Sequence, residues 1–242
     1  MHQQTYKNIT IVFIDSGSND GTVNMIKSYD FDSRVVKGNE NWWWARSVNE
    51  GLKYIKTLNL RPEDIVGIIN DDVILNDTYL ENVDKYLNKE QDVLLGSKLV
   101  NQDGIIESGI FFDKRNMKFV KTDHSINCSS TRGLFFKYSL LPKIGLMRQN
   151  FFPHYFSDYD LTLRANYKGL EIKFTPEVYI NLHLDTQSKG KSNNQNTRLL
   201  SNANASNIVR RLIFITSHCP INRIPILYAK EIKIIVKKTH EK

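Results

Sequence analysis

Two adjacent carboxylates follow a short apolar run near the middle of the chain. The run covers residues 65–69, has the length of a buried strand, and stops at Asn70-Asp71-Asp72 before apolar residues resume at 73–75. In an open α/β sheet, ligands bind at the carboxyl ends of the strands. Carboxylates at that edge could hold a divalent metal ion and, through it, a phosphate. A polar turn leaving the strand is the alternative, because a short motif is weak on its own.

A further acid, Asp15, also ends an apolar, β-branched run. Residues 9–14 read ITIVFI and lead into Asp15 and a turn-rich string, SGSNDGT. This transition again places polar groups at the carboxyl edge of a strand. Arg46 stands near the start of an amphipathic helix expected over residues 45–57. Arg46 could bind a phosphate or a carboxylate, or form an ordinary surface salt bridge.

Two candidates come from the second half of the chain. Asp158 lies at the start of a helix expected to close at Gly169, where free backbone N–H groups favour an ionised carboxylate. The alternative role of Asp158 is to cap this helix. His183 ends a strand expected over residues 178–183. A lone histidine at a strand end is more often structural than a ligand.

The segments between these residues predict alternating strands and helices. Three consecutive tryptophans, residues 42–44, cannot all face one core from one helix, so at least one should line a groove or lie under a loop. Gly133 begins a short expected strand, where a glycine indicates close approach of a ligand or backbone, or a bulge. Further strands are expected over residues 34–37, 93–100 and 171–175, a hairpin over 109–120, and helices over 22–29, 77–88 and 139–145.

The composition is that of a folded globular protein. The 242 residues are 40% hydrophobic and 24% charged. The two cysteines form no CxxC pair and the six histidines no HExxH pattern, which argues against a disulfide scaffold or a zinc site and suits a reducing compartment. No basic leader with a long apolar region and no run of about 18 apolar residues is found, so we expect neither a secretion signal nor a membrane span.

The net charge of +7 is concentrated at the C-terminal end. From residue 208 onward eight basic residues face two acidic ones. A basic, aliphatic-rich tail could bind an anionic membrane surface or a nucleic acid, or could be a solvated helix. We expect no nucleic acid partner, because the tail lacks the aromatic and glycine pattern of RNA-binding modules.

Taken in order, these motifs resemble family 2 glycosyltransferases of the GT-A fold, closest to bacterial rhamnosyltransferase-like members. IVFIDSGSNDGT resembles the family's strand and D-x-x-S-x-D-G-[ST] loop, and residues 39–52 resemble its N-x-G-x-x-x-A-R-N-x-G segment, with Trp43 and Ser47 as departures. Asn70-Asp71-Asp72 sits where the family has its DXD-type metal motif. Residues 133–160 resemble the block that runs through K-I-G to F-F-x-Y-x-E-D-x-D-L, and His183 matches a histidine that often follows. The similarity spans residues 3 to about 190.

The resemblance implies a fold and a reaction. The fold is α/β, a GT-A (Rossmann-like) mixed sheet flanked by helices, with a helical basic tail. The reaction is an inverting transfer of a hexose from a UDP- or dTDP-sugar to a hydroxyl of a cell-surface glycan or its lipid-linked precursor. Mg²⁺ or Mn²⁺ would neutralise the departing diphosphate, with Asp72 as principal ligand. Asp158, matching the second acid of the family's E-D pair, would be the base, and Ser157 replaces the first acid.

The remaining candidates would bind the donor. Asp15 should accept the N3–H of uracil or thymine. Asn70 and Asp71 would take part in donor or metal binding, and Arg46 and His183 would sit near the diphosphate or the metal. The family's usual first strand and helix, with a P-T-Y/F-N-like turn, are expected to be missing, because Gln4-Thr5-Tyr6 corresponds to the end of that helix and its loop.

We expect a GT-A-like domain over residues 1–190 and a linker with a basic tail over 191–242. The expected location is the cytoplasm, with the tail at the inner face of the membrane, and an oligomer is compatible with the sequence. Two rivals stay open at this stage: a nucleotide-sugar-binding module that acts with a partner chain without turnover, and a nucleic-acid-binding protein, which would bind any duplex with steep salt dependence.

Overall fold

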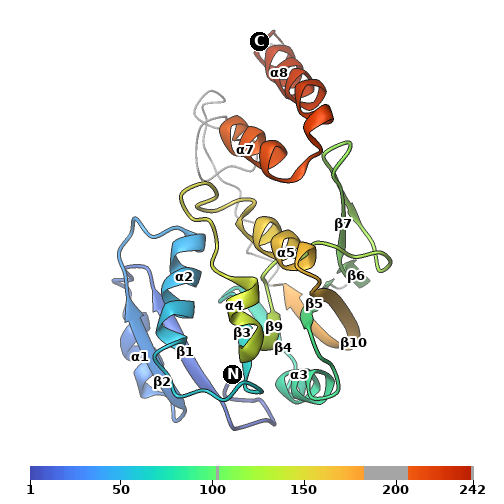
Figure 1. Cartoon of the computed structure of the whole chain (residues 1–242). Helices are drawn as coiled ribbons and strands as arrows, with labels where there is room; N and C mark the ends of the chain where they lie inside the picture. The colour runs from blue at the N-terminus through green and yellow to red at the C-terminus, as the bar shows by residue number, and fades with distance from the viewer. Residues whose placement is uncertain (102–103, 183–206, 241–242) are drawn as a thin grey trace.

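The computed structural model describes residues 1–101, 104–182 and 207–240, with side chains through residue 234 in the last range. At its centre is a mixed sheet in the order β3-β9-β5-β10-β4, with β6 paired to β5. β10 runs parallel to β5, whereas β9 is antiparallel to both β3 and β5, and β4 is antiparallel to β10. The expected α/β fold with a mixed sheet is therefore confirmed (Figure 1). The sheet's strands are β3 (Ile65–Ile68), β4 (Val73–Leu75), β5 (Val93–Asn101), β6 (Gly104–Glu107), β9 (Leu134–Lys137) and β10 (Glu171–Leu182).

Side-chain alternation along the strands builds a core on each face of this sheet. Leu94 and Leu134 point to one face, and their neighbours Leu95 and Phe135 to the other. The first core is closed by α2 (Trp44–Ile55), α4 (Leu141–Ile144) and α5 (Ser157–Tyr167), and the second by α3 (Tyr79–Leu87). The result is a sheet between two helical layers, the arrangement that buries both faces of a sheet of this kind.

A separate two-stranded sheet lies beside the central one. β1 (Thr10–Asp15) and β2 (Asp32–Lys37) pair in parallel and are connected by α1 (Thr22–Ser28). Helix α2 packs on β1, where a Cβ added to Gly51 would lie 3.0 Å from the Cδ1 of Ile14. The segment before β1 is tied to the main body, because Gln4 Oε1 accepts the N–H of Leu80 at 2.9 Å in α3. Figure 1 shows this unit at one side of the central sheet, with α2 between them.

The strands predicted over residues 171–175 and 178–183 form one strand in the structure, so the prediction of two was wrong. β10 continues through Pro176, which has no N–H to donate to the ladder. Its pairing with β5 shifts register between Phe174 and Tyr179, and this irregularity absorbs the proline.

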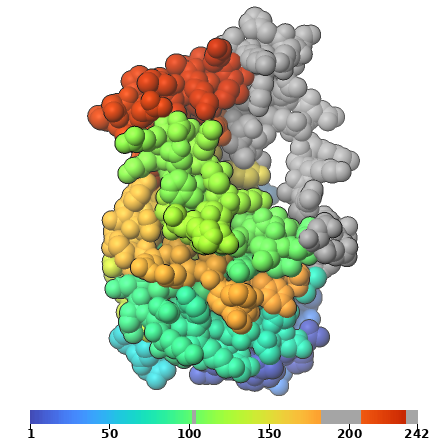
Figure 2. All heavy atoms as spheres, turned by 90° about the vertical axis from the view of Figure 1, so that its right-hand side faces the viewer, coloured from blue at the N-terminus to red at the C-terminus, as the bar shows by residue number. Residues whose placement is uncertain are grey.

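The C-terminal helices pack on the body through a third core. Helix α7 (Ile208–His218) places Phe214 and Ile215 against Phe112 of the hairpin β7 (Ile110–Asp113)–β8 (Lys118–Lys121), and against Phe152 beside α5. A short 3-10 turn, η3 (Ile221–Arg223), leads into α8 (Ile224–His240). Figure 2 shows these helices above the hairpin on one side of the molecule. The short 3-10 helix η1 (Tyr138–Leu140) precedes α4.

Candidate active site

The acidic loop follows the end of β3 at the edge of the central sheet. Asn70 and Asp72 are half-buried and Asp71 is exposed. One side-chain oxygen of Asn70 and one of Asp72, Oδ1 in each case, is buried and has no hydrogen-bond partner within the described part of the chain. A buried oxygen without a donor is costly unless a ligand supplies one. These two residues therefore have the property expected of ligand-binding groups.

Gly133 brings a second segment against this edge. Its N–H donates to the carbonyl of Ile68 at 3.0 Å, and its φ of 76° is one that glycine adopts readily. A Cβ at this position would lie 2.5 Å from Ser97 Oγ and 2.7 Å from Tyr79 Oη. We predicted close approach of a ligand or backbone, or a bulge, at Gly133; the structure instead places two side chains, Ser97 and Tyr79, against it, and the residue precedes β9 and does not belong to it.

Asp158 is joined to the same segment through one carboxylate oxygen and to α2 through the other. Oδ1 accepts the indole N–H of Trp44 at 2.8 Å, and Oδ2 accepts the backbone N–H of Thr131 at 3.3 Å. Trp44 begins α2, Asp158 stands in the first turn of α5, and Thr131 lies two residues before Gly133. One carboxylate thus connects two helices to the loop that touches the end of β3.

The alternative role of Asp158, a helix cap, does not occur. Helix α5 begins at Ser157, its N-cap is Phe156 with φ 69°, and no side chain caps it. Ser157 Oγ donates to the carbonyl of His154 at 2.5 Å and also lies within hydrogen-bond distance, 3.3 Å, of Oδ1 of Asp158. Asp158 is therefore directed away from its own helix terminus and towards α2.

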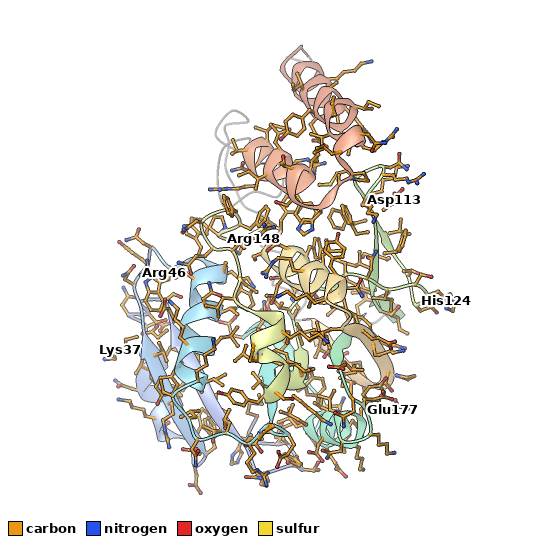
Figure 3. The ribbon with its side chains drawn as sticks, viewed as in Figure 1. Lys37, Arg46, Asp113, His124, Arg148 and Glu177 are labelled. Atoms are coloured by element: carbon orange, nitrogen blue, oxygen red, sulfur yellow. The ribbon has the colours of Figure 1, made fainter. Side chains whose placement is uncertain are left out.

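Asp15 and Arg46 lie on the neighbouring unit. Asp15 is buried and accepts the N–H of Ser18 at 2.8 Å. The hydrogen bonds from Ser18 and a weaker attraction from Lys37 lower the pKa of this carboxyl; burial opposes them, and the pKa stays below its ordinary value. Arg46 is exposed, and its guanidinium lies 4.9 Å from the ring centroid of Trp42. Figure 3 shows Arg46 at one end of α2. Within the described residues no hydrogen bond or ion pair joins either residue to Asp72 or Asp158.

A hydroxyl pair connects the two units near these candidates. Ser16 Oγ, next to Asp15, lies 3.0 Å from Ser47 Oγ on α2. Three residues earlier in the same helix, Trp44 reaches Asp158. Helix α2 therefore links the loop after β1 to the start of α5.

The neighbourhood of Asp158 includes residues that the sequence did not single out. Trp44 and Thr131 hold the carboxylate, Arg132 has a buried Nε without a partner in the described chain, and so has His154 at Nδ1. Burial lowers the pKa of His154, while Asp158 opposes the shift. The tryptophan run was the only sequence signal for this group, because the spacing from Trp44 to Asp158 carries no periodicity.

Glu107 adds a second carboxyl to this neighbourhood. Its pKa is raised mainly by burial, Lys121 and Arg132 lower it, and the charge of Asp158 raises it further. It stands on β6, about fifty residues before Asp158. Within the described residues, no hydrogen bond joins Glu107 to Asp158.

Unpartnered buried groups concentrate in this region. Of the seven buried side-chain atoms without a hydrogen bond in the described residues, five belong to segments that meet here, and two, Asn76 Nδ2 and His218 Nδ1, lie elsewhere. The five are both donors and acceptors, which suits a polar ligand with phosphate and hydroxyl groups. They are Trp42 Nε1, Asn70 Oδ1, Asp72 Oδ1, Arg132 Nε and His154 Nδ1.

The donor set at the acidic loop fits a hard cation. Asn70 and Asp72 offer an amide and a carboxylate oxygen, the ligands that Mg²⁺ and Mn²⁺ take. Across the described ranges, no three His, Cys, Asp or Glu side chains gather into a metal-binding group. His183, the other predicted ligand, lies outside the described residues.

Comparison with solved structures places this architecture in the GT-A class. A structure titled "Crystal structure of GalNAc-T7 with UDP, GalNAc and Mn2+" matches with a TM-score of 0.55 at 12% identity, over 72% of this chain and 37% of that one. The mannosyltransferase PcManGT from Pyrobaculum calidifontis, in complex with GDP-Man and Mn²⁺, matches with a TM-score of 0.55 at 17% identity, over 95% of this chain and 62% of that one. The chain therefore spans less than two thirds of either neighbour, and at these identities the likeness concerns the fold.

Comparison of the sequence with protein-family models identifies the family. Residues 1–140 match the model of "Glycosyl transferase family 2", and the chain belongs to that family. A search of curated proteins returned no match. No helix in the described part of the chain is long and apolar enough to cross a membrane.

Proposed function

We propose that the protein is an inverting glycosyltransferase. It would move a hexose from a UDP- or dTDP-sugar to a hydroxyl of a cell-surface glycan or of its lipid-linked precursor, in the manner of the rhamnosyltransferase-like members of its family. The observation that carries this proposal is the position of Asp158, held between α2 and the Thr131–Gly133 segment that touches the end of β3. A carboxylate and an acidic loop at one sheet edge suit a reaction that needs both a base and a diphosphate site.

In the proposed reaction Asp158 takes the proton of the acceptor hydroxyl. The acceptor oxygen forms a bond to the anomeric carbon from the face opposite the diphosphate, while the bond from that carbon to the phosphate oxygen breaks and the nucleoside diphosphate leaves. Proton removal by a positioned side chain accelerates such a step by about 10²- to 10⁴-fold. Trp44 and Thr131 orient Asp158.

The donor would be bound at the acidic loop and beside β1. Asp72 and Asn70, with Asp71 next to them, would hold Mn²⁺ or Mg²⁺, which when bound neutralises charge on the departing diphosphate. Asp15 would accept a hydrogen bond from the nucleobase, and Arg46 would meet the diphosphate. His183 would join the metal site.

A panel of nucleotide sugars tests the donor part of this proposal. Each sugar nucleotide is added with and without Mn²⁺, and the shift in thermal unfolding is measured. We expect a uridine or thymidine diphosphate sugar to raise the melting temperature only with the metal. A preference for a purine nucleotide would overturn the donor assignment. Product analysis by NMR would then test inversion at the anomeric carbon.

A second candidate is a nucleotide-sugar-binding module without turnover that acts with a partner chain. Two observations favour it. Both carboxylate oxygens of Asp158 are already occupied by donors, and the β1–β2 unit is not hydrogen-bonded to the central sheet. Calorimetry with UDP and dTDP plus Mn²⁺, followed by assays for transfer and hydrolysis, separates the two, because binding without either reaction supports the module.

A further inference from the structure

A hollow on the molecular surface lies between the hairpin β7–β8 and the C-terminal helices. It has a volume of about 430 Å³ and is lined by Arg115, Asn116, Pro220, Asn222 and Arg223. The first two belong to the hairpin turn and the others to the segment that leads into α8. Arg223 Nε donates to the carbonyl of Arg115 at 3.1 Å, which fastens η3 to the turn. Figure 3 shows Asp113, at the base of this turn, beside the C-terminal helices.

The charge around this hollow is positive and unbalanced. In the described residues neither Arg115 nor Arg223 forms an ion pair with a carboxylate, and Lys114 lies next to them in the turn. The one nearby acid, Asp113, accepts the N–H of Arg115 at 2.9 Å and the side-chain amide of Asn116 at 2.7 Å. Asp113 keeps its negative charge, because both donors are neutral, and it is outnumbered by the cations Lys114, Arg115 and Arg223. Two guanidinium groups and two amides form a donor-rich hollow that suits a phosphate.

Exposed aliphatic side chains adjoin this basic hollow. Ile221, between Pro220 and Asn222, is 86% exposed, and Ile226 in the first turn of α8 is 55% exposed. On the hairpin, Phe111 and Val120 are paired across the strands and are also exposed. Solvent exposure of an isoleucine to this extent has no benefit for folding, so these residues suit an apolar partner.

Helix α8 carries further exposed side chains of the same character. Its inner face holds α7, with Leu227 buried and Glu231 bound by Arg211 through two hydrogen bonds of 2.7 Å. The only acid in the described side chains of α8 is thus neutralised inside. The outward side chains are aliphatic or cationic: Ile226, Lys230, Ile232, Lys233 and Ile234.

We propose that this surface, formed by the β7–β8 turn, η3 and the outer face of α8, docks on an anionic phospholipid membrane. The hollow between Arg115 and Arg223 takes the phosphate of a lipid headgroup, and Ile221 and Ile226 enter the boundary between headgroups and acyl chains. Cations attract the anionic surface, and the isoleucines give the apolar contact. A nucleic acid would use the cations but not the isoleucines, so the membrane fits both sets of residues.

This docking does not depend on the proposed catalytic site, since none of its residues belongs to that site. It would hold the protein at a lipid surface through a hollow built between the hairpin and the C-terminal helices. An acceptor carried on a lipid would then be presented to the protein at the same surface.

Vesicle flotation of the full chain tests the proposal. Vesicles of phosphatidylcholine alone are compared with vesicles that also contain phosphatidylglycerol. We expect the protein to float only with the second, and the double variant Arg115→Gln/Arg223→Gln to lose about 25-fold in partitioning, at about fivefold per cation. Ile221→Ser/Ile226→Ser, at positions that are largely exposed, should also weaken flotation while leaving the melting temperature unchanged.

The matched control removes two exposed arginines elsewhere. Arg34→Gln/Arg61→Gln lowers the net charge equally, at residues paired with acids on the other side of the protein, and should float like the wild type. Equal loss in this control would mean non-specific charge attraction and overturn the proposal. So would failure of the wild type to float, or duplex DNA binding that is lost in the arginine variant but not in the isoleucine variant. Inorganic phosphate that abolishes flotation at low concentration would assign the hollow to a free anion.

Discussion

At the scale of single residues, the site depends on how one carboxylate is held. Asp158 is oriented by an indole N–H and a backbone N–H, and not by the N–H groups of its own helix. Such support fixes the position of a group more firmly than solvent contact does. Asp158→Asn should lower kcat by about 10²- to 10⁴-fold, because the amide cannot accept the proton of the acceptor. Steady-state kinetics together with donor calorimetry measure this.

The affinity of Asp158→Asn for the nucleotide sugar shows whether the fall in kcat comes from loss of a base or from loss of structure. Unchanged binding of the nucleotide sugar in Asp158→Asn supports the role of a base. Loss of binding, or a large fall in melting temperature, would make Asp158 a structural link between α2 and α5.

Trp44 provides a second prediction at this scale, as a positioning residue. Trp44→Phe keeps an aromatic ring but removes the N–H that reaches Asp158, so kcat should fall by about tenfold to a hundredfold while the KM for the donor stays close to that of the wild type. Trp43→Phe is the matched control, because Trp43 is exposed and its ring only tilts against His154. An equal effect of both variants on kcat would contradict a specific role for the indole of Trp44.

At the scale of elements, α5 joins the candidate site to the C-terminal helices. Asp160, two residues after Asp158 in α5, is fully buried. Its carboxylate is hydrogen-bonded to Arg148, to Arg164 at 3.0 Å and to His218 of α7 at 2.9 Å. Figure 3 shows Arg148 between α5 and the C-terminal helices. Burial alone would raise the pKa of Asp160, but the bonds from His218 and Arg148 and the charge of Arg164 outweigh it and lower the pKa to about 2.

This lowered pKa predicts a pH-dependent stability. Because the folded-state pKa lies below the unfolded value of about 3.9, the stabilisation is present above that value and is lost as the pH falls towards 2. Asp160→Asn should lower the free energy of unfolding by about 3 kcal/mol at pH 7, because it removes a fully buried carboxylate and leaves the partly buried Arg148 and Arg164 without their partner. Urea unfolding should show this gap shrinking between pH 5 and pH 2.

Asp32→Asn is the control for this series, since its exposed pair with Arg34 should contribute little. A gap between wild type and Asp160→Asn that stays constant down to pH 2 would mean that the carboxylate charge of Asp160 does not hold the C-terminal helices.

Element positions could be predicted from the sequence where apolar periodicity was long. The bounds of β1, β3 and α2 were predicted to within a residue or two. The two strands were visible as continuous apolar runs, and the helix as apolar residues on one face. The break predicted near Pro176 was wrong, since tertiary pairing with β5 outweighed the local signal. The tryptophan run indicated that one of its side chains would line a groove, but not that Trp44 would reach Asp158. Arg132 could not be found from the sequence, because only folding brings it to this region.

At the scale of the whole molecule, the central sheet and the β1–β2 unit differ in how they are buried. The side chains of β9 are all buried, whereas α1 has no buried residue and Asp15 is the one buried residue of β1. Segments with few buried contacts open at lower free energy. Amides of β1 and β2 should therefore exchange with deuterium faster than those of β5 and β9.

Binding of the nucleotide donor should reduce the difference in amide exchange between β1 and the central sheet. If Asp15 contacts the nucleobase, a uridine or thymidine diphosphate with Mn²⁺ should slow exchange in β1 and in the loop after it. Exchange in β3 and α5 that slows while β1 stays unaffected would remove Asp15 from the donor site.

The central claim is that Asp72 and Asp158 belong to one site for a metal-bound nucleotide, and calorimetric titration of UDP and dTDP tests it most directly. With Mn²⁺ the wild type should bind one of them, and Asp72→Asn should bind it at least about tenfold more weakly, a loss of about 1.4 kcal/mol. Asp77→Asn, an exposed acid five residues further on, should bind like the wild type. Equal affinity in all three proteins, or binding that does not depend on Mn²⁺, would contradict the claim.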